Sequence, residues 1–224
     1  MTEMWVDLLP VLFAMMISPA RTLAVILLLH TPRATTTALA YVAGMVSAMM
    51  LQGAALGLAM TIVGRAATDR SADLAVVIGV LYLVGGVILL AGAFKIATAE
   101  GAGGTLASLF DRLEHIDPSG AYQIGFGWIF ASPKQWVFVL TAVAVIFAAD
   151  LRPLGSLANF LVFSVLVQLA YFLIIGAYAI APDRVGGALD AVFGWIRANL
   201  KATAIGLFAT FGVVFLIKGL TTVG

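Results

Sequence analysis

Two short motifs interrupt long apolar runs of this sequence and carry the residues best suited to bind a ligand. They read Ser18-Pro19-Ala20-Arg21 and Ser132-Pro133-Lys134-Gln135. Proline removes a backbone donor and collides with the preceding helical turn, so a helix must kink or break at each motif. A break at that depth frees backbone groups that lipid cannot satisfy, which is tolerated only inside protein or beside a water-filled cavity. We therefore expect the two motifs to form one central site.

Arg21 and Lys134 each place a positive charge near the middle of an apolar run. On insertion scales such a charge costs about 2.5 to 3.5 kcal/mol. No acidic residue lies in the middle of an apolar run, so a buried carboxylate within the chain cannot offset that cost. An anionic ligand, water or backbone carbonyl groups must do so, unless the side chains extend to the membrane interface. The same lack of acids argues against a metal site.

Gln52 and Gln168 lie near the centres of two further apolar runs. Glutamine in a membrane helix is more often a hydrogen-bonding link between helices than a ligand contact. Both are nevertheless candidates, because they recur at matching positions in the two halves of the chain. The candidate substrate-binding residues are Ser18, Pro19, Arg21, Gln52, Ser132, Pro133, Lys134, Gln135 and Gln168. We expect no catalytic residue, no metal ligand and no cofactor.

The composition identifies the class of protein. Hydrophobic residues make up 62% of the chain and charged residues 10%, and the mean hydropathy is +1.11, far outside the range of soluble domains. The sequence therefore predicts an integral membrane protein. A net charge of +1 gives no indication of a nucleic-acid partner. The absence of cysteine excludes disulfides, thiol relays and thiolate metal sites within the chain.

Six apolar runs are long enough to cross a bilayer, which requires about 20 helical residues. They cover approximately residues 5–29, 37–63, 74–97, 122–147, 156–181 and a last stretch that reaches 217. A polar segment, 99–121, separates two sets of three runs. Within it, residues 106–116 have the spacing of an amphipathic helix that lies in the membrane interface or packs on the transmembrane body. A second amphipathic piece, 185–201, precedes the last run.

The polar exceptions recur in the same order in the two sets of runs. The first set carries Ser18-Pro19, Gln52 and Lys95, and the second carries Ser132-Pro133, Gln168 and Lys218. Chance is the alternative explanation, because such residues also occur in unrelated helices. An odd number of spans per repeat makes the second repeat enter the membrane from the opposite side, which is typical of transporters.

The predicted fold is an all-α membrane protein with six transmembrane helices arranged as two inverted three-helix repeats, in which helices 1 and 4 are broken by proline. A single transporter domain, 1–224, contains the first repeat, 1–98, the polar loop with its amphipathic helix, 99–121, and the second repeat, 122–224. The loop cations favour, by a small margin, an N-terminus outside the cell.

This pattern resembles the lysine exporter (LysE) superfamily, and the second half is similar to its glycolipid-addressing (GAP) or sulfolipid-1-addressing (Sap) branch. The resemblance covers nearly the whole chain. Its family pattern has Asn-Pro-Lys where this chain has Ser132-Pro133-Lys134. The other matching pieces are Leu113-Glu114-His115-Ile116-Asp117, Gly125, Pro182-Asp183-Arg184, Trp195, Asn199 and Lys218-Gly219-Leu220. The resemblance implies export or translocation of lipids or glycolipids across the cytoplasmic (plasma) membrane of a bacterium, specifically an actinobacterium.

We expect a multi-pass transporter without enzyme activity that moves an anionic amphiphile such as a phospholipid or glycolipid. One alternative is a LysE/RhtB-type exporter of amino acids or other small solutes. Another is a membrane scaffold for lipid synthesis or export that transports nothing. The expected partners are membrane lipids and an anionic lipid or glycolipid substrate, with no nucleic acid. A homodimer is compatible with the sequence.

Overall fold

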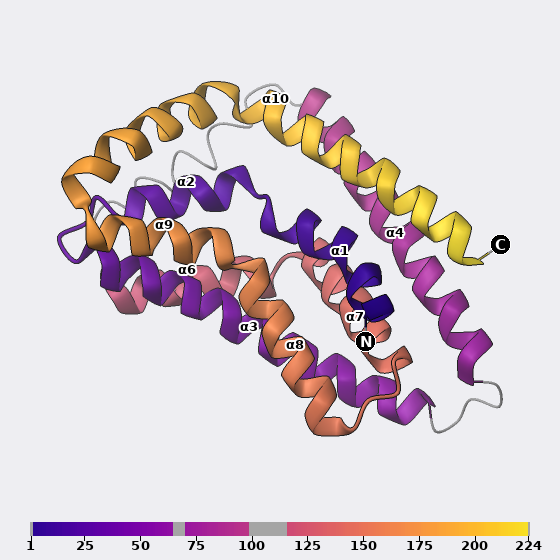
Figure 1. Cartoon of the computed structure of the whole chain (residues 1–224). Helices are drawn as coiled ribbons and strands as arrows, with labels where there is room; N and C mark the ends of the chain where they lie inside the picture. The colour runs from indigo at the N-terminus through magenta and orange to yellow at the C-terminus, as the bar shows by residue number, and fades with distance from the viewer. Residues whose placement is uncertain (1, 65–69, 99–115, 224) are drawn as a thin grey trace.

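The computed structural model describes residues 2–64, 70–98 and 116–223, and in these ranges the chain forms helices and no strand (Figure 1). The predicted amphipathic helix, 106–116, lies outside the described residues except for its last position. The helices are α1 (Thr2–Met16), α2 (Pro19–Leu28), α3 (Ala34–Gly64), α4 (Arg70–Thr98), α6 (Pro118–Phe130), α7 (Pro133–Ala148), α8 (Pro153–Val167), α9 (Leu169–Ile180) and α10 (Pro182–Val223).

Helices that are long and apolar enough to cross a membrane account for most of the described chain. Three are single helices, within Ala34–Ile62, Ala75–Thr98 and Pro182–Val223. Three more spans result if each bent pair, α1 with α2, α6 with α7 and α8 with α9, crosses once, giving up to six. The predicted all-helical fold is confirmed for the described residues, and the length and composition of these helices indicate a membrane protein. The inverted relation of the two halves stays a prediction.

Both proline motifs break a helix at the predicted residues. The bend is 56° between α1 and α2 and 73° between α6 and α7. Ser18 (φ −137°, ψ 100°) and Ser132 (φ −85°, ψ 114°) have extended backbones, because a following proline disfavours the helical conformation of the preceding residue. The prolines themselves begin α2 and α7, since the first position of a helix needs no internal donor.

A third break, of 56°, separates α8 from α9 at Gln168. The backbone N–H of Gln168 ends α8 by donating to the Val165 carbonyl, and its carbonyl begins α9 by accepting from the N–H groups of Tyr171 and Phe172. Neither proline nor glycine causes this break. The sequence analysis expected one span over 156–181 and placed helix breaks only at the two proline motifs, so it missed this break.

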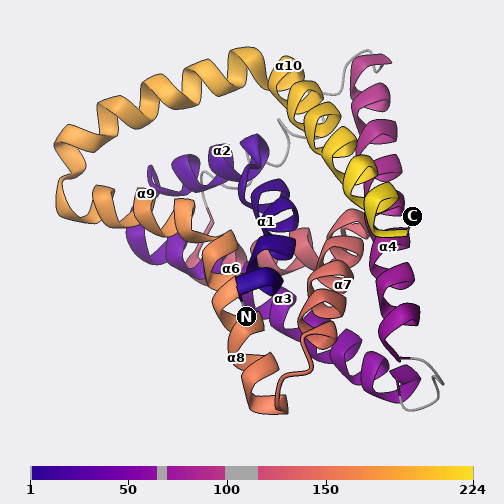
Figure 2. The ribbon, with the colours of Figure 1, turned by 45° about the vertical axis from the view of Figure 1, so that its right-hand side comes forward.

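Helix α10 joins two elements that the sequence analysis separated. Its 42 residues correspond to a length of about 63 Å at about 1.5 Å per residue, twice the hydrocarbon thickness of about 30 Å. No proline follows Pro182, so nothing local interrupts the helix between 185–201 and the last span. The first part of α10 arches over α2 and α9, and the second part runs beside α4 (Figures 1 and 2).

The close packing of α3 on α6 depends on one glycine from each helix. A Cβ atom on Gly44 of α3 would collide with the Tyr122 carbonyl oxygen of α6, and a Cβ atom on Gly125 would collide with the Tyr41 carbonyl oxygen. Small residues allow such close approach of backbones inside a membrane. Helix α3 therefore lies tightly along α6, as both views show (Figures 1 and 2).

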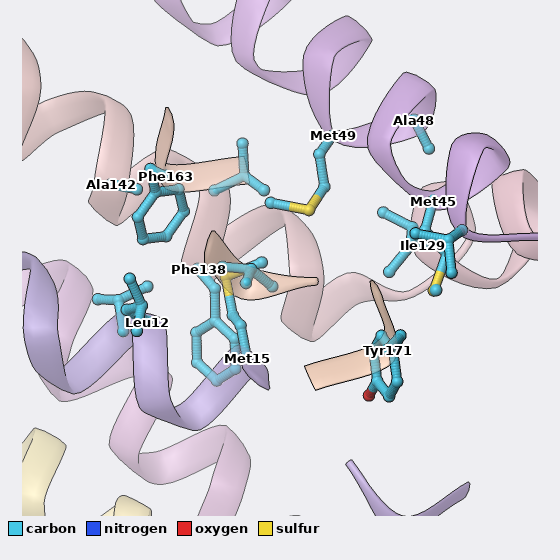
Figure 3. Close-up of a cluster of buried hydrophobic side chains, with 14 of the residues drawn as sticks. Leu12, Met15, Met45, Ala48, Met49, Ile129, Phe138, Ala142, Phe163 and Tyr171 are labelled. Atoms are coloured by element: carbon cyan, nitrogen blue, oxygen red, sulfur yellow. The ribbon is translucent and has the colours of Figure 1, made fainter. Parts of the chain in front are cut away.

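The apolar core joins the two halves of the chain next to the helix breaks. Leu12 and Met15 of α1 pack with Met49 of α3, Phe138 of α7 and Phe163 of α8, and all five are buried (Figure 3). Helix α1 ends at the first proline motif and α7 begins at the second. This packing therefore places the C-terminal end of α1 and the N-terminal part of α7 in one core.

Candidate functional site

Most of the buried polar atoms without a hydrogen-bond partner in the described residues belong to predicted site residues. They come from the side chains of Arg21, Gln52, Gln135 and Gln168, joined by the hydroxyl group of Tyr41. Buried polar groups are normally paired, and an unsatisfied one costs about 1 to 3 kcal/mol. Such a concentration is typical of a site that holds a ligand or ordered water.

Arg21 lies in the first turn of α2 and is 3% exposed. One guanidinium nitrogen, Nη2, donates a hydrogen bond to the carbonyl oxygen of Met15, which the helix break leaves free of a helical partner. The other, Nη1, has no partner among the described residues. A backbone carbonyl group, one of the partners expected to offset the charge, is therefore present. The Nη1 end of the guanidinium group still lacks an acceptor in the described residues.

Two tyrosines lie near this guanidinium. Tyr171 lies in the first turn of α9, and the centre of its ring is 5.9 Å from the guanidinium carbon of Arg21. Its hydroxyl group is 3.4 Å from the carbonyl oxygen of Met16, the last residue of α1. Tyr41 of α3 is fully buried and lies within electrostatic range of both Arg21 and Tyr171. The sequence analysis missed both tyrosines, because a tyrosine in an apolar run has the same pattern as any core aromatic.

The first turn of α7 supplies the second cation of the candidate site, Lys134, and an amide side chain, Gln135. The ammonium nitrogen of Lys134 lies 4.5 Å from the centre of the Phe208 ring of α10, a favourable cation–π geometry. Its charge is close enough to that of Arg21 for the two to repel. Gln135 is 3% exposed, and neither its amide nitrogen nor its amide oxygen has a partner in the described part of the chain.

Gln52 and Gln168 both link helices, as glutamines in membrane helices commonly do. The amide nitrogen of Gln52 is 3.4 Å from the carbonyl oxygen of Ile129 in the last turn of α6. The amide nitrogen of Gln168 is 3.6 Å from the sulfur of Met49 on α3. Both amide oxygens lack a donor within the described residues. Each glutamine thus connects α3 to a helix break and keeps one acceptor unpaired.

The Ser-Pro residues shape the backbone of the site. Neither Ser18 nor Ser132 caps the helix that follows it with its hydroxyl group. The carbonyl oxygen of Phe130, which the second break leaves without a helical partner, accepts a hydrogen bond of 2.7 Å from the Trp136 indole nitrogen. Side chains from the turn after each break therefore satisfy the backbone before it.

The described helices form at least two cavities. One, of about 350 Å³, is lined by α3, the end of α7, the 150–151 turn and α8. The other, of about 240 Å³, is lined by Asp7, Tyr82 and Lys218 among others. Neither is lined by a predicted site residue, so the polar cavity expected to be shared by Arg21 and Lys134 stays a prediction.

Comparison with known proteins identifies the family of the chain. No curated protein and no solved structure matches it. A family model described as "Sap, sulfolipid-1-addressing protein" matches residues 8–221, a range that includes both Ser-Pro motifs and every other predicted site residue. The chain therefore belongs to the Sap, sulfolipid-1-addressing protein family.

Proposed function

We propose that this protein is a transporter that translocates a lipid or glycolipid with an anionic headgroup across the cytoplasmic membrane, without an enzymatic step. Membership of a family described by the addressing of a sulfolipid indicates a role in lipid export or addressing. The observation that carries the finer proposal is the set of buried, unpartnered polar atoms around the three helix breaks.

The charges and dipoles at these breaks favour an anion. Arg21, Gln135 and Tyr171 each lie in the first turn of a half-helix, α2, α7 or α9. The N-terminus of a helix carries partial positive charge and unpaired N–H groups, which suit sulfate, phosphate or carboxylate. In the described residues no acid pairs with Arg21 or Lys134. A negatively charged headgroup would therefore find complementary charge at this level of the membrane.

The two inverted repeats belong to this proposal, and the helix contacts support it. Helix α4, the last span of the first half, packs on α7, the half-helix after the second proline motif. Helix α10, the last span of the second half, packs on α2, the half-helix after the first motif. Exchanging the two halves would convert one contact into the other. Helices α4 and α10 also pack on each other, as expected for a pair related by a two-fold axis.

To move a headgroup across the membrane, the protein must replace the water molecules that hydrate it. Moving an unpaired polar group into an apolar medium costs several kcal/mol. The Arg21 guanidinium nitrogen Nη1, the amide nitrogen of Gln135 and the Tyr41 hydroxyl group would donate to the anionic oxygens and offset that cost, because each is buried without a partner in the described residues. The amide oxygens of Gln52 and Gln168 would accept from hydroxyl groups of the headgroup. The acyl chains would stay in the hydrocarbon while the headgroup passes the breaks.

The test is a lipid-flipping assay in proteoliposomes containing fluorescent phosphatidylglycerol, fluorescent phosphatidylcholine or a free amino acid. We expect phosphatidylglycerol to cross fastest, and its advantage over phosphatidylcholine to shrink as salt shortens the Debye length from about 10 Å at 0.1 M to about 3 Å at 1 M. Transport of the amino acid with no lipid movement would support the small-solute exporter. Lipid binding without movement of any probe would support the scaffold.

A further inference from the structure

The cavity of about 350 Å³ differs from the polar residues at the helix breaks in having a largely apolar lining. One face of α3 supplies Met50, Gly53, Ala54, Gly57, Leu58 and Thr61 to its lining. Their spacing of three and four places all six on one side of the helix. The opposite wall comes from the end of α7, the 150–151 turn and the start of α8, and is largely apolar. The volume lies within the range of about 300 to 1,000 Å³ typical of small-molecule sites.

Glycine residues make this side of α3 a groove. Nothing lies within 4 Å of the position that a Cβ atom on Gly57 would occupy, so the backbone faces open space. A Cβ atom on Gly53 would collide with the Phe160 ring, which therefore closes the groove at that end. Leu58 and Leu157 line the groove and remain 65% and 53% exposed. On membrane-spanning helices, such exposed apolar side chains face lipid.

The length of the groove matches one leaflet of a bilayer. From Met50 to Thr61 the helix rises about 16 Å, roughly half of a hydrocarbon core of about 30 Å. Thr61 lies in the last turn of α3, and Asp150 lies in the turn between α7 and α8, so both are at the ends of apolar helices. Met50 and Gly53 lie at the other end, near the middle of α3, and Gly53 directly follows Gln52 of the polar site.

We propose that this groove binds one acyl chain of the lipid that the protein moves, and so holds that lipid next to the polar residues at the helix breaks. The inference rests on the proposed function and adds the subsite for the chain. An apolar groove in contact with the bilayer excludes water because hydrating its walls is unfavourable.

Filling the groove tests the proposal. Gly57→Leu places a side chain in the open space and replaces glycine by a better helix former, so the protein should still fold. Gly176→Leu in α9 is the matched control, because its Cβ position also has nothing within 4 Å and it does not line the groove. The probe is phosphatidylglycerol with a photoreactive diazirine at the end of one acyl chain, incorporated into nanodiscs with the purified protein.

Mass spectrometry of the crosslinked peptides gives the readout. We expect the wild-type protein and Gly176→Leu to be labelled mainly within 50–61 and 146–160. We expect Gly57→Leu to lower that labelling by about tenfold, which corresponds to about 1.4 kcal/mol of binding free energy. Equal labelling of Gly57→Leu and the wild type would overturn the proposal, as would labelling spread evenly over all lipid-facing helices.

Crosslinking involves no transport step, which separates this proposal from the proposed function. If wild-type protein is labelled in the groove but flips no lipid, the proposed transport function is overturned, and so is the proposal that the bound lipid is a substrate. Protein that flips phosphatidylglycerol without groove labelling would overturn the acyl-chain site alone. If the Gly57→Leu variant loses the label, it should also flip lipid more slowly than the Gly176→Leu variant. Equal flipping rates would show that the bound acyl chain does not belong to the transported lipid.

Discussion

The guanidinium carbon of Arg21 lies 5.9 Å from the centre of the Tyr171 ring, so the first turn after one helix break faces the first turn after another. Arg21 donates to the carbonyl oxygen of Met15, and the Tyr171 hydroxyl lies near the carbonyl oxygen of Met16. The two residues thus satisfy the backbone at the end of α1. What remains unpaired on the arginine is the nitrogen atom that we assign to the headgroup.

Arg21→Gln should slow the flipping of fluorescent phosphatidylglycerol by at least about tenfold. A hydrogen bond to a charged group contributes about 1.5 to 3 kcal/mol, and about 1.4 kcal/mol corresponds to a factor of ten in rate. The initial flipping rate in proteoliposomes measures the effect. Arg33→Gln is the matched control, because Arg33 is exposed just beyond α2. Equal losses in both variants would show that the effect is one of overall charge and would contradict the assigned role.

Gln135→Leu should stabilise the protein and impair transport. Removing an amide whose nitrogen and oxygen are both buried without a partner in the described residues relieves a cost of about 1 to 3 kcal/mol. Thermal unfolding in detergent should shift upwards, while the flipping rate falls, as when a site is retained for activity at the expense of stability. The exposed Gln123 of α6 provides the control substitution, Gln123→Leu. A lower unfolding temperature for Gln135→Leu would instead indicate that the amide has a structural partner.

The ion pair between Lys218 and Asp7 should stabilise the packing of α10 on α1. The ammonium nitrogen lies 2.7 Å from the carboxylate oxygen, and both side chains are partly exposed. A double-mutant cycle with Asp7→Asn and Lys218→Met should give a coupling energy of about 0.2 to 1 kcal/mol that decreases with salt. Lys95, predicted as the counterpart of Lys218, pairs with no acid among the described residues. The cycle of Asp7→Asn with Lys95→Met should therefore be additive.

Gly125→Ala should destabilise the protein, because its Cβ atom would collide with the Tyr41 carbonyl oxygen and push α6 away from α3. Overpacking of this kind costs about 1 to 3 kcal/mol. Gly127→Ala, two residues later on the same helix, meets nothing within 4 Å and should be neutral or slightly stabilising. Thermal unfolding of the two variants measures the difference. Equal unfolding temperatures would show that α3 and α6 do not approach as closely as described.

The helix breaks show how far local chemistry predicts the fold. The breaks at Ser18-Pro19 and Ser132-Pro133 could be predicted, because proline alters the backbone wherever it occurs in a helix. The number of candidate spans also follows from local hydropathy. The break at Gln168 could not be predicted, because its residue type is compatible with a helix. In the structure the Gln168 side chain reaches Met49 on α3, a contact between residues far apart in the chain.

The candidate site divides in the same way. Arg21, Gln52, Gln135 and Gln168 could be selected from the sequence, because a polar side chain in an apolar run must be buried with a partner or serve a ligand, whatever surrounds it. Tyr41 and Tyr171 became part of the site only through packing. A tyrosine ring packs well in any apolar core, and the role of its hydroxyl group can be assigned only when its neighbours are known. The groove beside Gly57 likewise exists only in three dimensions, because α7 and α8 must lie opposite α3 to form its second wall.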